Sequence, residues 1–203
     1  MTIKVTLHLL ENAGPKQLGI ASRACELLEQ AVNDPRFVPE VLGATYLETR
    51  VSEPDGSTRS VPVKSLPEFV LQGLERGTAA DAEIDLKVVL DGFRRGVLGS
   101  TLTGVLPFRT AYWFINDCIK YDEPAELAGH FMHEWLHVCG FYHWPNNSAR
   151  DDVAYNLGNI VRKLARGDAK SESAMPDWLN GAECGATVTE NVVIDSDADD
   201  RIL

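Results

Sequence analysis

Residues 133–143 hold the most closely spaced group of side chains capable of chemistry, and they read HEWLHVCGFYH. If this stretch is helical, His133 and His137, at positions i and i+4, lie one above the other on the same face. Two imidazoles placed in this way can bind one metal ion at about 2.0–2.1 Å each. Glu134 lies beside that face, where its carboxylate can take a proton from water at the ion without being a ligand. The pattern therefore predicts a metal site with an adjacent general base.

A glycine and a third histidine extend the pattern. Gly140 follows the expected end of the helix, where a residue commonly needs the left-handed conformation that glycine adopts at little cost. The chain can then turn, and His143 can reach the same ion from outside the helix. Three protein ligands leave a fourth position for water or substrate, as a catalytic zinc requires, whereas a zinc that only holds the fold needs a further side chain. We therefore predict one zinc ion bound by His133, His137 and His143.

Other interpretations of these residues compete with this one. The histidines could instead be core residues of a buried helix whose nitrogens are hydrogen-bonded within the protein. This alternative leaves Gly140 and His143 without a role. His130 precedes His133 by one helical turn and is expected to be a core or supporting histidine, because three ligands are already present. Cys139 is expected to be a small buried apolar residue rather than a ligand.

The HExxHxxGxxH segment resembles the metzincin clan of zinc metallopeptidases, in which the same motif is followed by a methionine on a tight turn beneath the metal. Met175 is the candidate for this Met-turn, since it is the only methionine after His143. Asp177 stands where astacin-like and serralysin-like members have a tyrosine, so that tyrosine is missing. Trp144, the residue after the third histidine, does not identify a family, and the subfamily is unassigned.

The resemblance also implies a fold. Metzincins have an N-terminal strand and long helix, a mixed twisted sheet, and an antiparallel edge strand that precedes the central active-site helix and pairs with extended substrate. Residues 3–10, 17–32 and 110–116 match the first strand, the backing helix and the edge strand in order. An extended peptide is therefore expected to add to the sheet near residues 112–116.

The activity that the resemblance implies is that of a zinc-dependent endopeptidase. Glu134 would act as general base on the attacking water and then deliver a proton to the leaving amine. Tyr142 and Tyr155 are candidates for assisting zinc at the oxyanion, although both also fit as packing aromatics. The competing function is a catalytically weak, zinc-bearing module that binds peptides or a partner protein on the same fold. The presence of Glu134 argues against it, since zinc without catalysis has no need of that carboxylate.

Hydrophobic periodicity predicts the elements that position these residues. A helix is expected over 125–139, beginning at Pro124 and ending at Gly140, with Gly129 as its weak position. It is apolar on nearly every side, so it should be central and buried. The other expected elements are strands 3–10, 42–51, 60–63, 84–90 and 110–116, helices 17–32 and 67–77, and loops 52–60 and 92–104. This mixture indicates an α/β or α+β fold.

We expect a single catalytic domain, since 203 residues suit one hydrophobic core and no shift in composition marks a boundary. Residues 1–143 would form an upper N-terminal subdomain that includes the active-site helix. Residues 144–203 would form a small lower C-terminal subdomain with Met175 and an acidic tail, to which we assign no chemistry.

Composition narrows the class of partner. The formal net charge of −11 argues against nucleic-acid binding, which depends on clustered lysine and arginine. Apolar runs are too short to span a bilayer and the N-terminus lacks a signal-peptide layout, so we expect no membrane contact and a cytoplasmic or non-classically exported protein. The expected partner is a peptide or protein substrate. Disulfides stay open for the widely spaced Cys25, Cys118, Cys139 and Cys184.

Overall fold

The computed structural model describes residues 2–143 and 152–167. Its main sheet consists of β1 (Lys4–Glu11), β4 (Glu83–Asp91), β6 (Phe108–Ala111) and β5 (Gly99–Ser100), in the order β1-β4-β6-β5. The first three strands run parallel, and β5 runs antiparallel to β6 at the edge. The predicted mixed sheet is therefore present.

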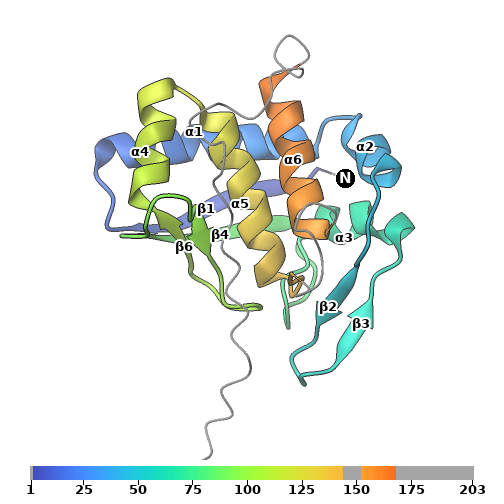
Figure 1. Cartoon of the computed structure of the whole chain (residues 1–203). Coiled ribbons are helices and arrows are strands. Elements are labelled where there is room, and N and C mark those ends of the chain that lie inside the picture. The colour runs from blue at the N-terminus through green and yellow to red at the C-terminus, as the bar shows by residue number, and fades with distance from the viewer. Residues whose placement is uncertain (1, 144–151, 168–203) are drawn as a thin grey trace, which may run out of the picture.

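Six α-helices accompany the sheet within the described residues: α1 (Pro15–Val32), α2 (Phe37–Gly43), α3 (Leu66–Leu71), α4 (Tyr112–Tyr121), α5 (Pro124–Val138) and α6 (Val153–Arg166). Figure 1 shows α1 crossing behind α5 and α6, while α4, α5 and α6 stand side by side. A hairpin of β2 (Arg50–Ser52) and β3 (Thr58–Ser60) projects from the main body, and a 3₁₀ turn, η1 (Val63–Ser65), leads into α3. None of the helices in the described part of the chain is long and apolar enough to cross a membrane.

Helix α5 lies at the centre of the fold. Every one of its residues is buried, and it contacts α1, α4 and α6 as well as strands β4 and β6. Strand β4 explains the adjoining core, because alternate side chains along it are buried: Ile84, Leu86, Val88 and Leu90. The buried, all-round apolar helix predicted from its sequence is confirmed.

Helices α5 and α6 approach each other closely through two glycines. A Cβ atom on Gly129 would lie 2.7 Å from the carbonyl oxygen of Gly158, and one on Gly158 would lie 2.8 Å from that of Gly129. Neither position has room for a side chain. The weak helix former at Gly129 is thus required by packing. Helix α6 lies directly against the face of α5 that carries His133, because a Cβ atom on Gly158 would also lie 3.3 Å from the His133 Cβ.

The prediction of a strand over 110–116 is wrong after Ala111, where α4 begins. The run of aromatic residues favours a strand by propensity, but its buried positions follow helical spacing: Phe114, Ile115, Asp117 and Cys118. Tertiary packing onto α1 and α5 outweighs the local preference. The antiparallel edge strand is therefore β5, and the expected substrate strand at 112–116 is helical.

The predicted strands near the hairpin are also partly wrong. Residues 42–43 end α2, and strand structure begins only at Arg50, so the expected strand over 42–51 is confirmed for its last two residues alone. The returning strand covers 58–60 rather than 60–63, where η1 forms. The first strand, the long α1 helix and strand β4 lie where the sequence predicts them. The helix predicted over 67–77 is confirmed in its first part alone, because α3 ends at Leu71.

Candidate metal centre

Three histidines meet between α5 and the N-terminal end of α6. The nitrogens that His133, His137 and His143 offer to a metal all lie within 4.8 Å of one another, and the first two residues are buried. The Nε2 atoms of His133 and His137 are 3.1 Å apart. Two nitrogens bound to one tetrahedral zinc at about 2.0–2.1 Å would be about 3.3 Å apart. The spacing of this pair therefore already fits a shared zinc ion.

The other nitrogen of each imidazole has a partner that orients the ring. His137 Nδ1 donates to the carbonyl oxygen of Phe141 at 2.7 Å, and His143 Nδ1 donates to the carboxylate of Asp152. His133 hydrogen-bonds the backbone of Ala154. Because a carbonyl oxygen can only accept, the proton of His137 is on Nδ1 and the lone pair is on Nε2. Such partners are the usual support of metal-binding histidines.

One nitrogen of this cluster is buried without a partner. His143 Nε2 finds no hydrogen bond within the described residues, although it is shielded from water. Leaving a buried polar atom unpaired is costly, and a metal ion would satisfy it. The donor set of three imidazole nitrogens suits zinc. The residues present therefore fit the group that the sequence pattern predicts.

Burial keeps the two imidazoles on α5 neutral. Loss of solvation lowers the pKa of His137 from 6.5 to about 4, with the neighbouring His143 adding to the effect. Desolvation, helped by His137 and His143, also lowers the pKa of His133 well below its usual value. A neutral imidazole is the form that binds a metal. At neutral pH the pair on α5 thus needs no deprotonation before it binds an ion.

The turn that carries the third histidine depends on Gly140 and on strand β2. Gly140 has φ +103°, in the region that favours glycine, as its place after the helix predicts. Ser52 N donates to the Gly140 carbonyl oxygen at 2.9 Å, and Val51 forms an antiparallel bridge with Phe141. The hairpin strand therefore supports the turn that leads to His143, a role that the sequence did not indicate.

Substituting Gly140 by alanine should disturb this turn. The new Cβ would lie 2.6 Å from the Ser52 carbonyl oxygen, and an L side chain at this φ costs about 1–2 kcal/mol by itself. We expect Gly140→Ala to lower the free energy of unfolding by roughly 2–4 kcal/mol and to weaken zinc binding. Gly19→Ala is the matched control, because a Cβ in the α1 helix there meets nothing within 4 Å. Urea unfolding that finds both variants equally stable would contradict the constraint at Gly140.

Asp152 is a site residue that the motif did not predict. One carboxylate oxygen accepts from the Tyr155 backbone N–H at 2.9 Å and caps α6, while the other accepts from His143 Nδ1. Asp152 is buried, and its backbone forms an isolated parallel β-bridge with that of Glu48. An aspartate directly before a helical run of apolar residues is a helix-start signal, so the cap could have been found from sequence. Its contact with His143 could not.

The two roles of Asp152 can be separated by substitution. Asp152→Ala removes both, so we expect a loss of about 0.5–2 kcal/mol in stability and about 10–100-fold weaker zinc binding. Asp152→Asn keeps an oxygen that can cap the helix, so most of its effect should fall on zinc affinity. Competition with a chelating dye measures the affinity and thermal unfolding measures the stability. Wild-type zinc affinity in both variants would exclude the orienting role.

Glu134 is buried beside the cluster, and two side chains lie close to its carboxylate oxygens. Thr101 Oγ1 donates to Glu134 Oε2 at 2.5 Å, and His130 Nδ1 lies 3.6 Å from Glu134 Oε1. His130 Nε2 is in turn 3.1 Å from Thr110 Oγ1. Burial, with the nearby charge of Arg162, lowers the pKa of His130 to about 3. His130 is therefore a neutral supporting residue, and it is not among the three histidines that could share a metal.

The candidate tyrosines and Cys139 lie in different settings. The ring of Tyr155 is 4.6 Å from that of His133 and 4.8 Å from that of His143. Partial burial raises the pKa of the Tyr142 hydroxyl above its usual value, while the charges of Arg50 and Glu48 act on it in opposite directions. Burial raises the pKa of the Cys139 thiol well above its usual value, which disfavours the thiolate that zinc would need. Tyr155 thus packs against two of the three imidazoles.

Several predicted residues lie outside the described part of the chain. These are Met175, Asp177, Trp144, Cys184 and the acidic tail, and the predicted lower subdomain falls largely within the same range. The Met-turn and the division into two subdomains therefore stay predictions. Among the described cysteines, Cys25, Cys118 and Cys139 are free and buried.

A second group of metal-capable side chains lies on strands β1 and β4 and consists of His8, Glu83 and Asp85. It is more exposed than the histidine cluster, and its members already have partners. His8 Nε2 is 2.6 Å from Asp85 Oδ1, while Lys4 pairs with Glu83 at 3.3 Å. The buried histidine cluster is therefore the stronger candidate for a metal centre.

Comparison of the chain with protein-family models finds no match, and comparisons with curated proteins and with solved structures find no significant match. The assignment thus depends on the residues themselves. What they establish is a mixed α/β fold in which His133, His137 and His143 come together and could hold a metal ion.

Proposed function

We propose that this chain is a zinc-dependent endopeptidase of the metzincin type. The observation that carries the proposal is the orientation of the three imidazoles, each of which has a partner on one nitrogen while the nitrogens facing the cluster converge. A cluster that served only packing would not leave His143 Nε2 buried and unpaired within the described residues. The antiparallel edge strand and the central helix support the same family.

His133, His137 and His143 would hold the ion, and Glu134 would handle the proton. When bound, zinc supplies Lewis acidity, which polarises a substrate carbonyl and makes water easier to deprotonate. The Glu134 carboxylate accepts the proton of the attacking water and then donates it to the leaving amine. Glu134 is 1% exposed, and this burial favours the role of general base. A carboxylate that is shielded from bulk water passes its proton to the bound substrate rather than to solvent.

Strand β5 is the surface on which an extended peptide would lie. It is the last strand of the sheet, and no strand within the described residues pairs with its outer edge. A peptide can add to such an edge through main-chain hydrogen bonds, which suits a peptidase that acts on many sequences. Tyr155, packed against His133 and His143, is the candidate to assist at the developing oxyanion.

A chelation and reconstitution experiment tests the proposal. Protein stripped of metal should not cleave casein or a mixed peptide pool, and adding about one equivalent of zinc per chain should restore cleavage. Zinc-loaded His143→Ala, prepared in parallel, controls for contaminating proteases because it lacks one ligand. If one zinc binds tightly but no peptide in the pool is cleaved, the zinc-bearing interaction module is the better description.

A further inference from the structure

The segment 99–105, which comprises β5 and the turn after it, is attached to α5 at two points. Thr101 Oγ1 donates to Glu134 Oε2, and Gly104 N donates to the His137 carbonyl oxygen at 2.8 Å. Both acceptors belong to the HExxH stretch. The strand at the edge of the sheet is therefore joined to the helix at the general base and at a candidate ligand.

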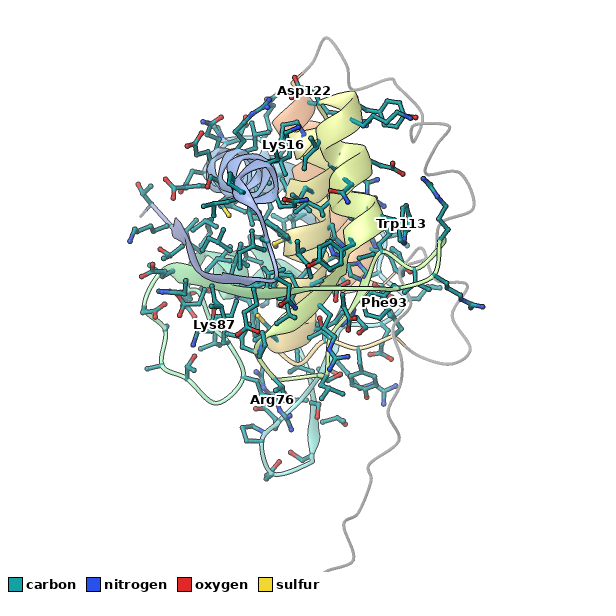
Figure 2. All side chains as sticks on the ribbon, turned by 90° about the vertical axis from the view of Figure 1, so that its left-hand side faces the viewer. Lys16, Arg76, Lys87, Phe93, Trp113 and Asp122 are labelled. Atoms are coloured by element: carbon teal, nitrogen blue, oxygen red, sulfur yellow. The ribbon has the colours of Figure 1, made fainter. Side chains whose placement is uncertain are left out.

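Arg76 also contacts this segment. Its Nη1 atom donates to the carbonyl oxygen of Thr103 at 3.3 Å, and its side chain fills the space where Gly104 lacks a Cβ. Figure 2 shows Arg76 at the end of the molecule opposite to Asp122, which lies two residues before the start of α5. The segment thus has little freedom to move away from α5.

The hydroxyl of Thr101 is placed to hold the carboxylate of Glu134. Thr101 is 7% exposed and Glu134 1% exposed, so water does not readily replace this hydrogen bond. The other carboxylate oxygen faces His130, which Thr110 of β6 contacts in turn. A buried carboxylate that has to reach a substrate needs such a fixed partner, because a misplacement of about 1 Å can cost roughly 10²-fold in rate.

We infer that Thr101 is a positioning residue that holds Glu134 in its productive orientation and links it to the strand on which the peptide binds. The inference rests on the proposed peptidase function. The residues of β5 that would pair with the peptide directly precede Thr101 in the chain. A peptide added to the edge would therefore lie next to the backbone that carries the hydroxyl, and Thr101 would hold the general base beside the bound substrate.

The kinetic test removes the hydroxyl while keeping the shape of the side chain. Thr101→Val should lower kcat by about 10- to 100-fold with KM changed by less than about 3-fold, at an unchanged zinc content of one ion per chain. Thr101→Ser, which keeps the hydroxyl, should stay within about 3-fold of wild type. Thr103→Val is the matched control, since its contact with Arg76 uses the backbone. Equal losses in Thr101→Val and Thr103→Val, or no rescue by serine, would overturn the inference.

A second measurement does not depend on activity. In metal-free protein, Thr101→Val removes a hydroxyl donor from a buried carboxylate oxygen, so the melting temperature should fall by about 3–8 °C. In a Glu134→Ala background the same substitution should have little effect, because the acceptor is gone. Equal shifts in the two backgrounds would disprove the contact, whatever the protein cleaves. A coupled shift in a protein that cleaves no peptide would instead refute the proposed function and leave the contact standing.

Discussion

Replacing Glu134 by glutamine is expected to lower kcat for peptide hydrolysis by roughly 10³- to 10⁴-fold. Glutamine keeps the size of the side chain and an oxygen that can accept from Thr101, but it cannot take up a proton. The three histidines are untouched, so zinc content and melting temperature should stay near those of the wild type. Initial rates on a fluorogenic peptide, with zinc measured on the same sample, provide the test.

Two further variants make the result specific to this carboxylate. Glu68→Gln changes an exposed glutamate of α3 and should be silent in rate and stability. Glu134→Ala should lose as much activity as Glu134→Gln, since both lack the base. A glutamine variant that cleaves at the wild-type rate would show that another group handles the proton.

Acid should unfold the metal-free protein steeply. Burial lowers the pKa of His130 from 6.5 to about 3 and that of His137 to about 4, and it lowers the pKa of His133 as well. The unfolded chain therefore binds more protons than the folded protein below about pH 6.5, and stability is lost as the pH falls from there towards the folded pKa values. Each histidine contributes up to about 1.4 kcal/mol per pH unit, so the three together reach roughly 4 kcal/mol per unit.

Urea unfolding at several pH values measures this slope, which gives the number of protons taken up on unfolding. Replacing His130 by leucine should reduce that number by about one, because one buried neutral imidazole is removed. Zinc should steepen the loss in the same window, since protons and metal compete for the other two histidines. Stability that stays constant between pH 6.5 and 4.5 would contradict the neutral, buried state of these side chains.

The parts of the fold that sequence predicts are those with long, regular patterns. Every second side chain of strand β4 is buried, and the buried side chains of α1 keep helical spacing for several turns, so their periods are unambiguous. Helix α5 is buried on every side, and its length and its start at Pro124 predict it instead. Strand β5 comprises only Gly99–Ser100 and offers no period to detect. The sequence of helix α4 predicts a strand because aromatic residues favour strands locally, whereas contacts with α1 and α5 decide its structure.

The candidate site likewise contains residues that the sequence predicts and residues that it does not. The motif is local, so the meeting of His133, His137 and His143 could be predicted from spacing alone. Thr101 and Asp152 could not, because each reaches the site from another element and no spacing rule connects them with α5. The supporting residues of a metal site are set by tertiary structure, and only coordinates reveal them. The catalytic role of Glu134 stays a prediction until the rates are measured.

The support that β2 gives to the turn after α5 has a consequence for the order of assembly. Strand β2 holds none of the three imidazoles, yet Val51 and Ser52 pair with the residues that lead to His143. Helix α5 is local and can form within about a microsecond, whereas pairing between such distant segments must wait for a long loop to close. A newly made chain would therefore offer two imidazoles before the third is in place, and an ion held by two bonds escapes readily. Stable metal uptake should then follow the folding of the whole domain rather than that of the helix.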